Sequence, residues 1–316
     1  MAFQITRAGK SSLILESPVM PAAGTMGFAD EYKGLVKLDK LGALVTNPVT
    51  LYPRSPASGT RVVALDSGVL VHSGLPNPGL SKVLENYADK WRKLPLPIIL
   101  HLIGTSPDEI RRACERIDEE DSIAAVELGI GDETPPQDAA RLVKGAEALE
   151  KPLIVRVPYQ DALPIARACA DAGADAVVVC AAPRGTARDA SGRLISGRVY
   201  GPLIKPMTLR LVGQMVRASS VPVIGAGGIH SAQDARDYLD AGAVAVQIDS
   251  ATWIRPQVIE IIARDLGGLV LTQPAGAFAD EWHEGIGQTE ANQPVEPSIS
   301  DVIPRPQKHK PKKDPK

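Results

Sequence analysis

Eight short, largely apolar segments recur along the first 250 or so residues, and this repetition constrains the fold more than any other feature. Each segment is apolar at successive positions, which is typical of a strand in a parallel sheet that is covered on both faces. Longer segments with helical signals separate them. The eight apolar segments are residues 18–24, 43–47, 97–103, 124–130, 152–158, 176–182, 221–227 and 243–249.

The intervening stretches predict helices. Ser106-Pro-Asp-Glu109 is a capping box with proline at the first helical position, and Ser231-Ala-Gln-Asp234 is a weaker version of the same start signal. Apolar residues also follow helical spacing in three further stretches, which are residues 142–149, 208–216 and 258–266.

A glycine stands just before three of the expected strands, at Gly42, Gly173 and Gly242, and an alanine flanks it in each case. Glycine suits the left-handed residue just past the end of a helix. The recurrence therefore indicates one helix–strand unit used several times.

Eight strands, each followed by a helix, predict an α/β fold that closes into a (β/α)8 TIM barrel. The alternative is an open doubly wound sheet, which usually has fewer strands and a glycine-rich turn after the first one. The first expected strand ends in Ala22-Ala-Gly-Thr-Met-Gly27, which is not G-x-G-x-x-G, so the barrel is favoured. The connection over residues 48–80 is unusually long, as lids and binding loops commonly are.

Composition narrows the class of protein. With 44% hydrophobic residues and a net charge of −2, the 316-residue chain is not disordered as a whole. It lacks an apolar run of about 18 residues and a secretory leader, so we expect a cytoplasmic protein without membrane contact. Three cysteines without C-x-x-C spacing favour neither a disulfide framework nor a redox or metal motif.

The C-terminal region differs from the rest. Residues 285–316 contain six prolines and little apolar periodicity, so we predict a barrel domain over 1–284 and a disordered, basic tail over 285–316. Residues 305–316 carry six Lys/Arg and one Asp, a net +5 that leaves the other residues at −7. An acidic body does not favour nucleic acid as a partner.

In such a barrel the active site lies at the carboxyl ends of the strands. Gly225-Ala-Gly-Gly-Ile-His-Ser231 follows the seventh strand, where glycines expose backbone N–H groups and a helix begins at Ser231. This combination predicts an anion site for a phosphate-bearing ligand, with a plain tight turn as the alternative.

Three further side chains need interpretation. Arg156 follows an apolar run and would place a fixed positive charge in the barrel mouth, or form a salt bridge at the rim. Lys205 precedes a helix start and either faces a ligand or is structural. His101 has apolar neighbours and is interpreted as a buried, hydrogen-bonded histidine. No spacing of His, Cys, Asp or Glu predicts a metal site.

The chain resembles the dihydroorotate dehydrogenases, FMN-binding barrels of pyrimidine biosynthesis. The resemblance covers most of residues 17–265, and the order and spacing of its segments are more specific than any one of them. The segments are Ser17-Pro-Val-Met-Pro-Ala-Ala-Gly24, Gly42-Ala-Leu-Val-Thr-Asn-Pro-Val-Thr50 with Pro53-Arg54, Gly74-Leu-Pro-Asn-Pro-Gly79, Gly201-Pro-Leu-Ile-Lys-Pro206 and the loop 225–229.

The resemblance implies FMN across the strand ends, with its phosphate held by the loops after strands seven and eight. Arg156 stands where the family has a lysine near the flavin, which keeps the positive charge but changes shape and hydrogen bonding. Asn47 replaces a second family lysine, and the family's glycine–threonine pair after strand eight reads Asp249-Ser250 here. The implied cofactor-binding residues are Ala22, Ala23, Gly24, Asn47, Arg156, Gly201, Gly227, Gly228 and Ser250.

Several positions depart from the family pattern. Ile130 falls where the family has its cysteine or serine base, and isoleucine cannot accept a proton. Val71 and Ala181 replace substrate-binding asparagines, which implies that dihydroorotate is not the efficient substrate. Asp249 would repel a phosphate unless it points away.

Glu127 and Asp132 are candidates for proton transfer on position alone, with a solvated loop carboxylate as the alternative for each.

The leading functional hypothesis is a flavin oxidoreductase that transfers a hydride between FMN and a small substrate, dihydropyrimidine-like or other. One alternative is a barrel enzyme without flavin that acts on a phosphate-bearing substrate. Another is a non-catalytic family member that retains the fold. The resemblance also implies a homodimer.

Overall fold

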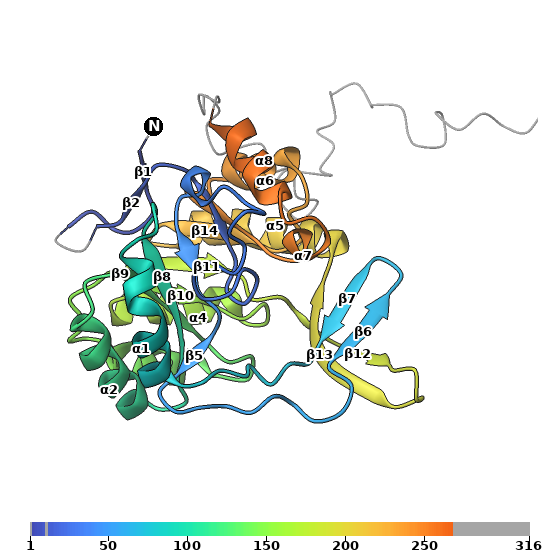
Figure 1. Cartoon of the computed structure of the whole chain (residues 1–316), viewed down its shortest axis with the longest axis horizontal. Coiled ribbons are helices and arrows are strands. Elements are labelled where there is room, and N and C mark those ends of the chain that lie inside the picture. The colour runs from blue at the N-terminus through green and yellow to red at the C-terminus, as the bar shows by residue number, and fades with distance from the viewer. Residues whose placement is uncertain (1, 10–11, 268–316) are drawn as a thin grey trace, which may run out of the picture. The chain divides into compact units, whose positions relative to one another are not determined.

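The computed structural model describes residues 2–9 and 12–267, and every structural statement below concerns that part of the chain (Figure 1). The predicted boundary at residues 284–285 and the predicted tail lie outside the described residues.

Eight parallel strands form the central sheet in the order β3-β15-β14-β11-β10-β9-β8-β4. Closure is completed where the Gly42 N–H, just before β4, donates to the Val19 carbonyl of β3 at 2.8 Å. The predicted (β/α)8 barrel is therefore confirmed, and each predicted apolar segment overlaps one of its strands. The strands are β3 (Val19–Pro21), β4 (Leu44–Val45), β8 (Ile98–Ile103), β9 (Ile123–Gly129), β10 (Leu153–Arg156), β11 (Ala176–Val179), β14 (Val223–Ala226) and β15 (Ala245–Ile248).

Helices follow these strands, with one exception. Between β3 and β4 the described chain has only the 3-10 turn η1 (Leu38–Lys40), so the expected helix after the first strand is wrong. Gly27 and Gly34 lie there at a φ of +83° each, a backbone conformation that breaks a helix. The helices are α1 (Leu80–Trp91), α2 (Pro107–Asp118), α3 (Pro136–Lys144), α4 (Ala162–Ala172), α5 (Lys205–Ala218), α6 (Ala232–Asp240), α7 (Ala251–Ile254) and α8 (Val258–Leu266).

Two predicted helix starts are confirmed by their caps. The Ser106 side chain accepts from the Glu109 N–H at the start of α2, and Ser231 accepts from the Asp234 N–H at the start of α6. The helix expected over 142–149 instead spans Pro136–Lys144, so the prediction is wrong over residues 145–149. It begins at Pro136 because the proline supplies a first-turn residue that apolar spacing did not reveal.

The glycines at the helix–strand junctions have two different causes. Gly173 and Gly242 have φ values of +119° and +99°, as predicted for residues past a helix end. Gly42 does not have a positive φ, so that prediction is wrong. A Cβ at Gly42 would lie 2.0 Å from the Ser17 carbonyl oxygen, so glycine is needed for close packing of two backbones.

A second, antiparallel sheet lies at the mouth of the barrel, where Figure 1 shows β6, β7, β12 and β13 grouped together. Its order is β12-β13-β7-β6, and it combines two segments that are far apart in the sequence. The connection 48–80 is therefore not a structureless loop. The strands are β6 (Val62–Leu65), β7 (Gly68–Val71), β12 (Arg184–Arg188) and β13 (Leu194–Tyr200), while β5 (Val49–Thr50) pairs with β8 and β1 (Phe3–Gln4) pairs with β2 (Ile14–Leu15).

The barrel interior is filled by apolar residues, including Met20, Val45, Ile99, Ala125 and Ile154. Along β8 the side chains of Ile99 and His101 point to the same face, because strand side chains alternate. The apolar layer is therefore followed by polar residues toward the carboxyl ends of the strands. Within the described residues no helix is long and apolar enough to cross a membrane.

Candidate active site

Four buried polar side chains from four strands form a layer inside the barrel. Arg156 Nε donates to Glu127 Oε1 at 2.9 Å, and Gln247 Nε2 donates to Glu127 Oε2 at 2.5 Å. Arg156 also donates to the Gln247 side-chain oxygen, and the His101 Nδ1 lies 2.8 Å from Glu127 Oε1. The prediction of a buried, hydrogen-bonded His101 is confirmed.

Glu127 is the centre of this layer and has no exposed surface. Burial raises the pKa of its carboxyl, but the Arg156 charge and the hydrogen bonds from His101 and Gln247 outweigh burial and hold that pKa well below its usual range. Glu127 is therefore ionised and neutralises Arg156. The alternative of a solvated loop carboxylate for Glu127 is wrong, and so is the rim salt bridge for Arg156, because both lie inside the barrel.

Above this polar layer lies a cavity of about 90 Å³ whose walls come from the carboxyl ends of the strands. Burial raises the pKa of the Cys180 thiol, which lines it, to about 12, so this cysteine carries no thiolate at neutral pH. Two larger cavities, of about 600 Å³ and 460 Å³, share Leu75 and Arg198 with it. The small cavity is lined by Ala22, Ala23, Pro48, Leu75, His101, Ile103, Gly129, Ile130, Arg156, Cys180, Ala181, Ala182, Arg198, Tyr200 and Asp249.

Arg198 of β13 borders all three cavities and was missed by sequence reasoning. Its two terminal nitrogens each lie 3.1 Å from the Asp132 carboxylate, and one donates to the Ala182 carbonyl at 2.7 Å. Arg184 stands 3.6 Å from the same carboxylate. Asp132 is thus held in an ion pair at the mouth. Alternating residues on both sides of the Asp189–Gly192 turn are the signal for the hairpin that carries Arg198.

The glycine loop after β14 has the geometry of an anion site. Gly227 and Gly228 have φ values of +110° and +66°, and neither N–H has an acceptor among the described residues. A Cβ at Gly228 would lie 2.5 Å from the Lys205 backbone nitrogen. The loop therefore excludes side chains and leaves buried donors without acceptors, as a bound anion requires.

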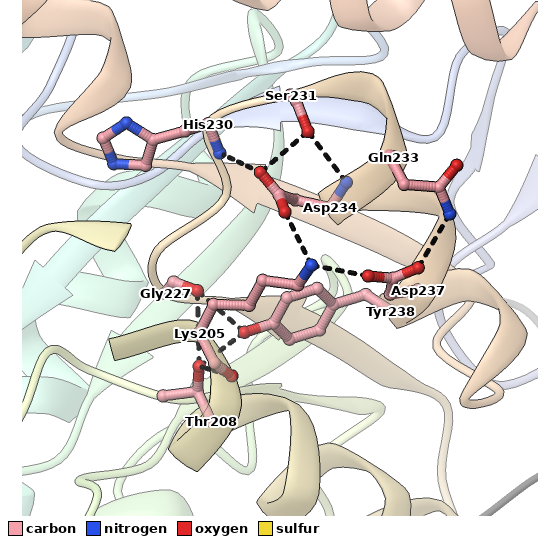
Figure 2. A network of polar contacts seen from close by, with 9 residues as sticks. All are labelled: Lys205, Thr208, Gly227, His230, Ser231, Gln233, Asp234, Asp237 and Tyr238. Carbon is pink, nitrogen blue, oxygen red and sulfur yellow. Dashed lines mark hydrogen bonds and ion pairs between the residues drawn. The ribbon is translucent and has the colours of Figure 1, made fainter. Parts of the chain in front are cut away.

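The start of α6, which the sequence also suggested for the anion, is occupied by its own side chains. The Asp234 carboxylate accepts from the His230 N–H at 3.0 Å and from the Ser231 hydroxyl at 2.8 Å. Lys205 forms ion pairs with Asp234 and Asp237, so of its two interpretations the structural one is confirmed (Figure 2). The free donors are those of the glycines.

Asp249 follows β15 and lines the small cavity. A charged carboxylate near a phosphate would be expected to point away instead. Burial raises the pKa of Asp249 against the lowering effect of hydrogen bonds from Ser250. Asp249 Oδ1 accepts from the Ser250 N–H at 2.5 Å. The Ser250 N–H is therefore taken, and its hydroxyl lies 3.3 Å from His230 Nε2.

Asn47 carries a second unsatisfied group. Its side-chain oxygen is buried and has no hydrogen-bond partner among the described residues. Such an acceptor costs about 1–3 kcal/mol unless a ligand supplies a donor. Asn47 precedes Pro48, which lines the cavity and lies 3.7 Å from the position of a Gly24 Cβ. Gly201, at a φ of +144°, comes within reach of the glycine loop, because its carbonyl oxygen would lie 3.0 Å from a Gly228 Cβ.

A closed barrel whose mouth combines free backbone donors, a buried arginine and an orphaned amide oxygen defines a TIM-barrel enzyme built for an anionic organic cofactor. The family model for dihydroorotate dehydrogenase matches residues 11–270 of this chain. The chain belongs to the dihydroorotate dehydrogenase family, and it is an FMN-dependent oxidoreductase that acts on CH–CH groups.

Individual relatives agree with the family match. The chain is similar to the dihydroorotate dehydrogenase B (NAD(+)) catalytic subunits of three bacteria. The Trichlorobacter lovleyi protein is 37% identical over 273 residues, which cover 81% of this chain and 90% of the relative. The Pelobacter propionicus protein is 36% identical, with 81% and 90% covered, and that of Geobacter metallireducens is 34% identical, with 80% and 88% covered.

The residues present fit FMN. The glycine loop offers unoccupied N–H donors of the kind a phosphate binds, and Asn47 and Arg156 offer polar groups beside a cavity that is otherwise mostly apolar. At the positions that depart from the family, Ile130 and Ala181 line the small cavity, and Val71 lines the one of about 460 Å³.

Proposed function

We propose that this protein oxidises or reduces the CH–CH bond of a small organic substrate by hydride transfer to or from FMN, and that dihydroorotate is a poor substrate. The observation that carries the proposal is the pair of buried, acceptor-free N–H groups at Gly227 and Gly228, at the same end of the barrel as the cavity that Arg156 and Asp249 line. The family assignment supports it.

The proposed binding mode follows from these donors. The phosphate lies on the Gly227 and Gly228 N–H groups, with the Ser250 hydroxyl and Gly201 beside it. The ring system lies toward Arg156, and the Asn47 amide oxygen receives a donor from the ligand. Ala22 and Ala23 line the cavity without large side chains, and Gly24 follows them in the chain, so a flat ring can lie on this segment.

FMN, when bound, supplies the acceptor or donor for the hydride. In the oxidative direction the substrate also loses a proton, which a protein group must accept. Glu127 does not suit this task, because it has no exposed surface and is not among the residues that line the small cavity. Of the two predicted candidates, Asp132 is the one that lines a solvent-connected cavity, so we assign the proton transfer to Asp132.

The substrate proposal rests on three apolar side chains. Val71, Ile130 and Ala181 offer no hydrogen bonds to a pyrimidine ring, and a polar substrate would leave its own donors and acceptors unpaired there. Leu75 and Ile103 add apolar surface where the cavities adjoin. We therefore propose a substrate with fewer ring hydrogen-bonding groups than dihydroorotate.

The names of the relatives give NAD(+) and call each protein a catalytic subunit. We propose that this chain likewise works in an assembly and returns its electrons to NAD(+). An exposed apolar surface supports an assembly: Leu203, Met207 and Ile254 are 68%, 44% and 80% exposed. Contact between the Tyr200 and Trp253 rings, at 4.9 Å between centroids, brings α7 next to the chain that leads into α5.

The direct test is anaerobic reduction of the bound flavin by candidate substrates. We expect its absorbance to fall quickly with a weakly polar cyclic CH–CH substrate and slowly with dihydroorotate. An Asp132→Asn variant should slow the reduction while it retains the flavin. Rapid reduction by dihydroorotate would contradict the substrate proposal, and an unchanged rate in Asp132→Asn would contradict the role of Asp132.

A further inference from the structure

Two buried hydroxyl groups, one from α5 and one from α6, contact the glycine loop. Tyr238 of α6 and Thr208 of α5 are both fully buried. Tyr238 OH donates to the Gly227 carbonyl at 2.7 Å, and Thr208 Oγ1 lies 3.3 Å from the same oxygen (Figure 2). The two hydroxyls also bond to each other.

A carbonyl has no proton, so the Tyr238 hydroxyl donates to the Gly227 oxygen. Thr208 Oγ1 has one proton and also lies 3.1 Å from the Ile204 carbonyl and 3.3 Å from the Lys205 carbonyl, so either hydroxyl can donate in the Thr208–Tyr238 contact. Burial raises the pKa of Tyr238, so the phenol keeps its proton and remains a donor. The arrangement places two buried hydroxyls against one loop carbonyl.

Fixing that carbonyl also fixes the next N–H. The peptide between Gly227 and Gly228 is planar and trans, so its C=O and N–H groups point in opposite directions. Because Tyr238 holds the Gly227 carbonyl toward the helices, the Gly228 N–H points away from them. That N–H has no acceptor among the described residues.

The packing leaves this peptide little freedom. A Cβ at Gly225 would lie 2.5 Å from the Tyr238 ring, and one at Gly227 would lie 3.0 Å from the Thr208 side chain. The loop therefore lies directly on these two residues. Without the hydroxyls, the glycines could rotate the peptide, since glycine permits most backbone conformations.

We propose that Tyr238 and Thr208 are positioning residues that aim the Gly228 N–H at the phosphate of FMN. The inference rests on the proposed binding mode but concerns residues that do not touch the cofactor. It predicts that loss of either hydroxyl weakens binding of the phosphate and leaves binding of the ring system unchanged.

The test compares FMN with riboflavin, which has the same ring system and no phosphate, on the apoprotein. The variants are Tyr238→Phe and Thr208→Val, and dissociation constants are measured by quenching of flavin fluorescence. We expect Tyr238→Phe to bind FMN about tenfold more weakly, equivalent to about 1.4 kcal/mol, with riboflavin affinity unchanged. Thr208→Val should show a smaller loss of the same kind.

Tyr87→Phe is the matched control, because it removes a phenol from α1, away from the loop. It should bind both ligands as the parent does. Equal FMN affinity in the parent and both variants would overturn the inference while leaving the binding mode intact. Equal losses for FMN and riboflavin would overturn it too, because they indicate a general distortion. A parent that binds riboflavin and FMN equally would overturn the binding mode itself.

Discussion

At the scale of single residues, the Glu127–Arg156 pair changes what the arginine can do. A lone Arg156 would present a full positive charge to the cavity, but Glu127 lies 2.9 Å from its Nε and cancels most of it. The side chains are 10% and 0% exposed, so the pair is shielded from solvent. Each charge therefore depends on the other.

Glu127→Gln should be strongly destabilising, because it leaves Arg156 buried without a counter-charge. Removing one partner of such a pair costs about 3–5 kcal/mol. Chemical denaturation should also show a pH dependence: since the native pKa of Glu127 lies below its unfolded value, its contribution is present above about pH 4.5 and lost as the pH falls.

The double variant Glu127→Gln with Arg156→Gln is the control, and it should recover much of the loss. A single variant as stable as the parent would show that the pair does not stabilise the barrel interior.

Asp249→Asn should be more stable than the parent at neutral pH. Burial raises the native pKa of Asp249 above its unfolded value, so the parent loses stability as the pH rises from about 4 through the native pKa. The variant lacks this loss, and the two proteins should converge near pH 4. Thermal denaturation across pH 4–8 measures the difference.

The FMN affinity of the parent should also fall as the pH rises, because an ionised Asp249 adds negative charge beside the cofactor. Asp240→Asn, which removes an exposed carboxyl from the end of α6, is the control and should change neither property. A parent and an Asp249→Asn variant with parallel pH curves would show that the pKa of this carboxyl is not raised in the native protein.

At the scale of elements, the strands were predictable and the mouth was not. The barrel strands are buried on both faces, so they leave continuous apolar segments in the sequence. Strands β12 and β13 are half exposed and carry arginines, so they leave no continuous apolar segment in the sequence. Arg198 therefore could not be placed at the mouth. The position of the glycine loop was predictable. The capping of α6 by its own side chains and the hydrogen bond from Tyr238 to the loop were not, because they depend on contacts across the fold.

Comparing Gly228→Ala with Gly192→Ala should separate the role of the glycine loop from the backbone strain that any alanine at a positive φ causes. A Cβ at Gly228 would meet backbone atoms of Lys205 at 2.5 Å and Gly201 at 3.0 Å, so the start of α5 must shift. Gly192→Ala is the matched control: at a φ of +85° it bears similar strain, and its Cβ would meet nothing within 4 Å.

Both variants should lose about 1–2 kcal/mol of stability from backbone strain. Only Gly228→Ala should also lose FMN affinity, by about tenfold or more. Equal FMN affinity in the two variants would place the phosphate elsewhere.

At the scale of the whole molecule, the barrel and the family could be predicted because both depend on patterns along the chain. The alternation of apolar segments with capped helices gave the barrel, and the order of several motifs gave the resemblance. The chemistry was harder to predict, because it depends on which side chains meet. Glu127 illustrates this: as a residue near a strand end it suggested a base, but three neighbours from other strands make it a buried counter-ion.

The absorbance spectrum of the purified protein tests the central claim most directly, namely that the mouth of the barrel holds FMN by the glycine loop. We expect bands near roughly 370 and 450 nm from bound flavin, released as FMN on denaturation. The Gly228→Asp variant, which adds bulk and negative charge at the loop, should be folded and colourless. A colourless parent that takes up no added FMN would contradict the account.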